Sequence, residues 1–171
     1  MLAKKKTLLL LIATTVFLCV NSAKAQHIRM GGGLGYGSGS NNLNFYVNTT
    51  YSLPQSPIRL GAVLGYSIRE ENSRRKRDRI RGNINAYLMI IDKRPFGIYG
   101  LGGLNLSRYK TKYKKGPDGP YSTSNIYAGA NVGGGLEMDA GVGRYFAEGK
   151  YIIGSQEISG FVVRTGLRIG I

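Results

Sequence analysis

The side chains with the clearest chemistry in this chain are basic. The stretch SRRKRDRIR, residues 73–81, contains six Arg or Lys residues opposed only by Asp78. Guanidinium and ammonium groups at this density bind phosphate or sulfate, and arginine can do so with two parallel hydrogen bonds. Taken alone, the stretch is typical of a nucleic-acid contact, a nuclear signal or a solvated charged loop. With a second basic cluster, it gives these candidate polyanion-binding residues: Arg74, Arg75, Lys76, Arg77, Lys110, Lys112, Lys114 and Lys115.

The residue inventory offers little for catalysis or metal binding. The only histidine is His27, and the only cysteine is Cys19. A serine nucleophile needs a rigidly held histidine, and a metal site needs clustered His, Cys or acidic ligands. Glu137 with Asp139 is an ordinary acidic pair at a strand end. We therefore predict no catalytic residue, no metal site and no cofactor, in a chain that is not an enzyme.

The N-terminus has the features of a bacterial secretory signal peptide. Lysines at residues 4–6 precede an apolar run at residues 7–20, and a small-residue cleavage step follows at residues 23–25. The run is shorter than the roughly 20 residues that span a bilayer, so a signal peptide is favoured over an anchor. We predict a signal peptide at residues 1–25 and one domain at residues 26–171. Export excludes a nuclear role for the basic run.

The C-terminal stretch GFVVRTGLRIGI, residues 160–171, alternates apolar residues with basic residues or glycine. Phe161 and Val163 share one parity, whereas Arg164 and Arg168 share the other. Side chains alternate faces along a strand, so the pattern predicts a strand with one apolar and one polar face. The stretches HIRMGGGLGYG and IRLGAVLGYSIR repeat the pattern.

Eight segments of this kind cover most of the chain. The fifth is the least regular, because Phe96 and Ile98 share one parity while Tyr99 and Leu101 take the other. A glycine-centred bulge near residues 100–103 would switch the two faces. The predicted strands are residues 27–37, 43–53, 57–69, 79–91, 96–108, 124–138, 143–153 and 160–171.

The connections between these segments alternate in length. In an up-and-down meander this places all short turns at one end, as in outer-membrane barrels with short periplasmic turns and longer outside loops. The pattern predicts an all-β fold, an eight-stranded antiparallel up-and-down transmembrane β-barrel. The basic clusters would then lie in outside loops, over lipid A phosphates. The short turns are at residues 54–56, 92–95 and 139–142, and the main longer connections are at 70–78, 110–124 and 155–159.

A lipid-facing barrel surface carries aromatic residues at both membrane interfaces. The chain contains no Trp, so tyrosine is expected to be the main residue of these belts. Tracing the strands up and down gives an outer group and an inner group. The outer group is Tyr36, Tyr66, Tyr151 and Phe161, and the inner group is Tyr51, Phe96 and Tyr145.

The other face of each strand would line the lumen. An eight-stranded barrel is just wide enough for side chains to fill its interior, and charges there must pair. Counting back from the turns places Glu137 opposite Arg144 and Glu148 near Arg164, with Lys150 sharing Glu148. Surplus arginines are expected near the ends, in water or on carbonyl groups. The predicted network is Glu137, Arg144, Glu148, Lys150, Arg164 and Arg168.

The signal peptide, the eight segments and the ending VVRTGLRIGI together resemble the small eight-stranded outer-membrane barrels of the OmpA/OmpX kind. The segment FAEGKY, residues 146–151, is similar to segments of that domain family. The resemblance covers residues 26–171 and implies an outer-membrane location in a Gram-negative bacterium. One departure is Ile171, because such barrels usually end in an aromatic residue that the assembly machinery reads.

Three functions remain open at this point. The first is a non-enzymatic barrel with a structural or surface-interaction role, acting as a monomer. Its partners would be outer-membrane lipid, lipopolysaccharide and the outer-membrane assembly machinery, with no nucleic acid. The second is a small anion-preferring pore. The third is a soluble periplasmic carrier of the lipocalin kind, which would place its apolar side chains inside.

Overall fold

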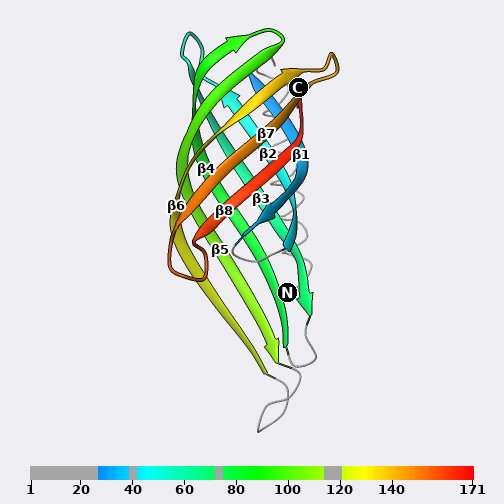
Figure 1. The fold of residues 1–171 in the computed structure, drawn as a ribbon, viewed down its shortest axis with the longest axis vertical. Helices are drawn as coiled ribbons and strands as arrows, with labels where there is room; N and C mark the ends of the chain where they lie inside the picture. The colour runs from blue at the N-terminus through cyan, green and yellow to red at the C-terminus, as the bar shows by residue number, and fades with distance from the viewer. Residues whose placement is uncertain (1–26, 39–41, 72–74, 114–120) are drawn as a thin grey trace, which may run out of the picture.

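The computed structural model describes residues 27–38, 42–71, 75–113 and 121–171. These residues form a closed, fully antiparallel barrel of eight strands, in which β8 pairs with β1 (Figure 1). The predicted fold class is therefore confirmed. The expected signal peptide, residues 1–25, lies outside the described residues. The strands are β1 (Ile28–Gly37), β2 (Asn42–Ser52), β3 (Ile58–Glu71), β4 (Arg75–Lys93), β5 (Phe96–Tyr113), β6 (Tyr121–Asp139), β7 (Arg144–Gly154) and β8 (Gly160–Gly170).

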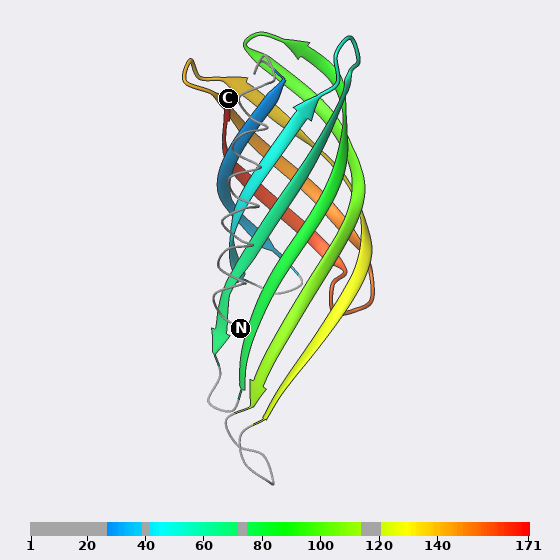
Figure 2. The same cartoon turned by 180° about the vertical axis from the view of Figure 1, so that it is seen from behind.

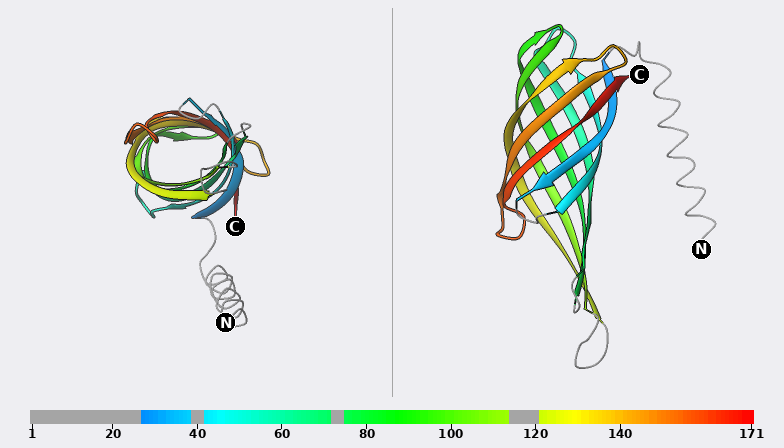
Figure 3. Two further views of the ribbon diagram at one scale, coloured as in Figure 1. Left: turned by 90° about the horizontal axis from the view of Figure 1, so that it is seen from below. Right: turned by 45° about the vertical axis from the view of Figure 1, so that its right-hand side comes forward.

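All strands are tilted in the barrel wall, and the connections between them differ at its two ends (Figure 2). The turns at residues 53–57, 94–95 and 140–143 lie at one end, which we call the short-turn end. At the opposite end, strands β3 to β6 run past the ends of β1, β2, β7 and β8 (Figure 3). We call this the extended end. The C-terminus lies at the short-turn end (Figure 1).

Apolar and polar residues, which alternate along each strand, lie on opposite faces of the barrel wall. Apolar side chains point outward, and many are more than half exposed, including Ile84 at 69%, Leu104 at 67% and Ile126 at 70%. Charged and amide side chains point inward and are buried. This arrangement is the reverse of a lipocalin-like carrier, so that alternative is wrong. An apolar exterior of this extent requires an apolar solvent around it.

Glycines on the inner face make room for large side chains in the lumen. A Cβ atom at Gly65 would lie 2.6 Å from Cε1 of Tyr46, whose ring covers that position. A Cβ atom at Gly135 would likewise lie 2.5 Å from the hydroxyl of Tyr99. Glycine at these two inner-face positions is therefore a packing requirement of a narrow barrel interior.

Three strands extend further than the sequence predicts. β4, β5 and β6 reach residues 75, 113 and 121, so residues 75–78, 110–113 and 121–124 are strand where loops are predicted. The β5–β6 pairing continues without a break to Tyr113 opposite Tyr121. Beyond the apolar belt the outward positions of β5 are basic, and Tyr109 and Thr111 face inward. The apolar–polar alternation that marks a strand in the sequence is therefore lost there.

The predicted bulge in the fifth strand is absent. The β5–β6 register runs evenly from Phe96 opposite Met138 to the end of the strand. Tyr99 and Leu101 simply point into the lumen, where they are 2% and 6% exposed. The parity of the strand is kept because these two apolar side chains pack inside the barrel.

The wall instead has a bulge in β4. Its pairing with β5 steps from Met89 opposite Tyr99 to Ile91 opposite Ile98, so Ile90 is an extra residue. An extra residue reverses the face of every residue after it. Asp92 consequently turns toward the lumen at the short-turn end.

Candidate functional site

The largest ion-pair cluster lies inside the short-turn end and centres on Glu137, which is 2% exposed. Its Oε2 lies 2.7 Å from Nη1 of Arg59 and 3.2 Å from Nη1 of Arg144. Its Oε1 lies 2.5 Å from Nη1 of Arg168. Nη1 of Arg29 is more distant, 3.9 Å from Oε2. One buried carboxylate therefore holds guanidinium groups from β1, β3, β7 and β8.

The register of the predicted Glu137–Arg144 pair differs from the expected one. Arg144 lies opposite Asp139, and Glu137 lies opposite Phe146. The two charges nevertheless meet, because the arginine side chain reaches diagonally to the next inward position.

A second acid, Asp92, completes this cluster, and the sequence pattern does not predict it. Its Oδ2 lies 2.7 Å from Nη2 of Arg59, and its Oδ1 lies 2.8 Å from Nη1 of Arg144. Arg59 lies near an end of the lumen, as expected for a surplus arginine, but it pairs there with carboxylates. Asp92 was assigned to a turn, and the bulge at Ile90 that aims it inward leaves no mark in the sequence.

A second ion pair lies deeper in the lumen. Glu148 and Arg164 face each other across β7 and β8, with Nε of Arg164 2.6 Å from Oε1 of Glu148. Nη2 of Arg164 donates to the Tyr87 hydroxyl at 3.2 Å, and the Tyr99 hydroxyl donates to Oε2 of Glu148 at 3.2 Å. Both charged side chains are fully buried. This pair lies where the alternation and the turns predict it.

The predicted ion pair between Lys150 and Glu148 is not formed. The Nζ atom of Lys150 donates to Oδ1 of Asn83 at 3.0 Å. The same oxygen accepts from Nδ2 of Asn105 at 2.9 Å and from Nδ2 of Asn131 at 3.1 Å. This layer of buried amides crosses the lumen between β4, β5, β6 and β7. The sequence does not predict that Asn105 points inward, because the parity of the fifth strand is irregular.

A buried apolar cluster lies inside the barrel toward its extended end. Ile158 in the β7–β8 connection is 3% exposed and belongs to a buried cluster. The backbone carbonyl of Glu157 accepts a hydrogen bond of 2.7 Å from the Tyr109 hydroxyl. The connection thus folds into the barrel mouth instead of standing out as a free loop. The other buried members of the cluster are Tyr46, Val63, Tyr109, Ile152 and Val162, with Tyr127 packed against them.

No family model matches the chain, and no curated protein does. Solved structures match it in fold. The N-terminal β-barrel domain of Pseudomonas aeruginosa OprF aligns with a TM-score of 0.62 at 12% identity, covering 85% of this chain and 98% of that domain. A major outer membrane protein of Thermus thermophilus aligns with a TM-score of 0.63 at 8% identity, covering 85% and 98%. Ail, the attachment invasion locus protein of Yersinia pestis, aligns with a TM-score of 0.56 at 17% identity, covering 84% and 95%.

The chain has the fold of the small eight-stranded outer-membrane β-barrels. At these identities the likeness shows the fold alone, and the function of this barrel has to be argued from its own residues. The described part of the barrel contains no group of three or more His, Cys, Asp or Glu side chains placed to hold a metal ion. Nor do the described residues include a helix long and apolar enough to cross a membrane.

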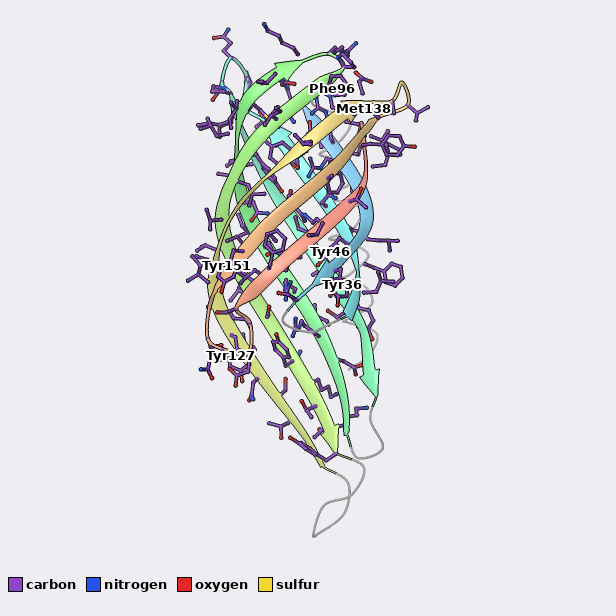
Figure 4. All side chains as sticks on the ribbon, in the orientation of Figure 1. Tyr36, Tyr46, Phe96, Tyr127, Met138 and Tyr151 are labelled. Atoms are coloured by element: carbon purple, nitrogen blue, oxygen red, sulfur yellow. The ribbon has the colours of Figure 1, made fainter. Side chains whose placement is uncertain are left out.

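The aromatic residues predicted for the belts all lie on the outer face of the barrel. Tyr151 pairs with Phe161 in the wall, and Phe96 lies opposite Met138, which lies opposite Tyr145. Phe96 and Met138 are close to the short-turn end, and Tyr36 and Tyr151 lie well away from it (Figure 4). The exposed fractions are Tyr36 48%, Tyr51 41%, Tyr66 46%, Phe96 59%, Tyr145 50%, Tyr151 48% and Phe161 48%.

The basic residues of the barrel's extended end are described only in part. Lys110 and Lys112 are exposed on the outer face of β5, and Arg108 joins them although the sequence interpretation left it out. Arg74, Lys114 and Lys115 lie outside the described residues, as do the side chains of Arg75, Lys76 and Arg77. The outer face of β5 thus changes from Leu104 and Leu106 to three basic residues in succession.

Proposed function

We propose that this chain is an integral outer-membrane protein of a Gram-negative bacterium, with a non-enzymatic structural or surface-interaction role. The observation that carries the proposal is the arrangement of its wall, apolar on the outside and charged on the inside. A spanning sheet must satisfy its backbone internally and expose apolar side chains to lipid, and a closed antiparallel barrel does both. In this account residues 1–25 direct export, the assembly machinery inserts the barrel, and the barrel acts as a monomer.

The filled lumen supports interaction over transport. Arg164, Arg168, Lys150 and Glu148 are each at most 2% exposed, and the apolar cluster around Ile158 lies beyond them. Eight strands leave an interior that side chains can fill, and here they do. An anion-preferring pore would need these groups to move, so the barrel wall and its extended end are the parts available to partners.

We infer that the extended end binds phosphate- or sulfate-bearing polyanions, with lipid A phosphates of lipopolysaccharide as the nearest source. Arg108, Lys110 and Lys112 follow directly on the lipid-facing Leu106, at the level where lipid headgroups begin. Basic side chains in such a row attract anions over a Debye length. Ail, whose barrel this chain resembles with a TM-score of 0.53 at 18% identity, has been solved in complex with the heparin analogue sucrose octasulfate.

Reversing the charges of this row should weaken polyanion binding. The variant Arg108→Glu, Lys110→Glu, Lys112→Glu, held in zwitterionic nanodiscs, should bind both lipopolysaccharide and a heparin-like polysaccharide about tenfold or more weakly at low salt, and the difference should shrink as salt rises. Reversing Arg74, Arg75, Lys76 and Arg77 should have the same effect. A loss for only one ligand would identify which polyanion the row prefers.

The matched control reverses Lys93 and Arg94 at the short-turn end, where Arg94 is 84% exposed. That change alters the net charge without touching the extended end. Unchanged binding by the first two variants would refute the polyanion proposal. An equal loss in the control would refute it too, because net charge alone would then account for the binding.

A further inference from the structure

The interior of the barrel carries more positive than negative charge. Among the described residues, six basic side chains are buried and only two acidic ones. Asp92, half-exposed at the rim, adds one more carboxylate. A buried charge without a counter-charge is costly, and arginine cannot shed its proton to avoid that cost. The buried bases are Arg59, Arg79, Arg81, Lys150, Arg164 and Arg168, and the buried acids are Glu137 and Glu148.

The acids do not form ion pairs with all of these bases. Glu137 and Asp92 hold Arg59, and Glu137 also holds Arg168. Glu148 holds Arg164. Within the described part of the chain, no carboxylate lies within 4.0 Å of Arg81 or Lys150, which are 4% and 1% exposed. Arg81 and Lys150 are therefore buried bases without a carboxylate counter-charge among the described residues.

The two unpaired bases lie on either side of one amide. Arg81 and Asn83 both point inward from β4, two residues apart, and Nζ of Lys150 reaches Oδ1 of Asn83 at 3.0 Å from β7. Lys150 also lies close enough to Arg81 and Arg164 for their charges to repel. A neutral amide oxygen that already accepts three hydrogen bonds offers these cations no net negative charge.

Three of the polar atoms left over at this place are donors, beside the amide oxygen of Asn131 and the hydroxyl of Tyr46. Nε of Arg81, Nδ2 of Asn83 and Nη1 of Arg164 are buried and have no hydrogen-bond acceptor in the described part of the chain. Buried polar groups are almost always satisfied, and two neutral oxygens offer these three donors neither enough acceptors nor a negative charge. A bound anion would supply both a hydrogen-bond acceptor and the missing negative charge.

We propose that Arg81, Asn83, Lys150 and Arg164 form a buried site for a small inorganic anion of the size of chloride. Val63, which lies opposite Asn83 in the β3–β4 pairing, and Ile152 are 3% and 0% exposed and belong to the apolar cluster toward the extended end. The bound anion would tie β4 to β7 and β8 across the lumen, so its role is structural and separate from polyanion binding outside.

The test compares the heat stability of the folded barrel in chloride and in gluconate, an anion too large for the site. The barrel is held in zwitterionic detergent at constant ionic strength, and its unfolding temperature is read from the loss of the compact form on SDS gels. Chloride should raise that temperature in a saturable way, as a ligand of the native state does, and bromide should act likewise. An unfolding temperature that is the same in chloride and gluconate would refute the site.

The variant Asn83→Asp supplies the missing negative charge from the chain itself. Its new oxygen replaces the unpartnered Nδ2, and the other oxygen still accepts from Lys150. This variant should unfold at a higher temperature than the wild type in gluconate and should lose the response to chloride. Arg108→Met, on the outer face, is the control and should keep the full response. An Asn83→Asp barrel that still responds to chloride as the wild type does would overturn the assignment of these residues.

Discussion

Replacing Glu137 by Gln should lower the free energy of unfolding of the barrel by about 3–5 kcal/mol, the usual effect of removing one partner of a buried ion pair. The change keeps the size and shape of the side chain. It removes the negative charge that Arg59, Arg144 and Arg168 share at 2.5 to 3.2 Å. Arg168, which is 2% exposed, would be left with Glu148 at 3.7 Å as its nearest carboxylate.

Urea unfolding of the barrel in lipid vesicles, followed by the SDS mobility of the folded form, measures this loss. The matched control is Asp139→Asn, the same chemical change two residues further along β6. Asp139 pairs at 3.3 Å with Arg94, whose side chain is 84% exposed, so its loss should cost about 1 kcal/mol or less. Equal effects of the two changes would show that Glu137 does not organise the short-turn end of the lumen.

Replacing Ile84 by Arg should destabilise the barrel in a lipid bilayer by about 2–4 kcal/mol, because an arginine near the bilayer midplane must leave water. Ile84 is 69% exposed on the outer face, in the middle of the apolar part of β4. On a protein surface exposed to water, the same change would alter the free energy of unfolding by only about 0.5 kcal/mol. The size of the effect therefore reports the solvent around the wall.

Ile126→Arg provides the depth control. Ile126 is equally exposed at 70% but lies opposite Arg108, where the outer face of β5 turns basic. Its replacement should cost about 0–1 kcal/mol, as found for charges near the interface. Reversible folding into phospholipid vesicles gives both values. Similar small effects at the two sites would contradict a membrane-embedded wall.

The strands that cross the apolar belt are predictable from the sequence because two different solvents impose the period. Lipid on one side and a packed polar lumen on the other produce the alternation in "GFVVRTGLRIGI", which forms β8 with Phe161 outward and Arg164 inward. The outer parts of β4, β5 and β6 lack this contrast, so their extent could not be predicted. The wrong prediction of a bulge in the fifth strand has a related cause. Tyr99 and Leu101 are apolar, but they pack inside this barrel.

The ion pairs were predictable only between strands that follow each other in the chain. Glu148 and Arg164 lie on β7 and β8, and the connection between these strands sets their register. Arg59 meets Glu137 across the lumen from β3, at a separation of 78 residues, which depends on how the whole barrel closes. Asp92 depends on a single bulge, and the inward fold of Ile158 depends on contacts with side chains from several strands that no local pattern encodes.

Gel mobility in SDS, compared without boiling and after boiling, tests the central claim most directly. The outer-membrane fraction of cells that express the full chain is the sample. A closed barrel has no strand edge from which to unfold, so it should resist SDS when cold and change mobility only after heating. We predict a heat-dependent shift of the protein in that fraction. A protein that shows no shift and is recovered in the periplasmic fraction would contradict the account of a lipid-embedded barrel with a filled lumen.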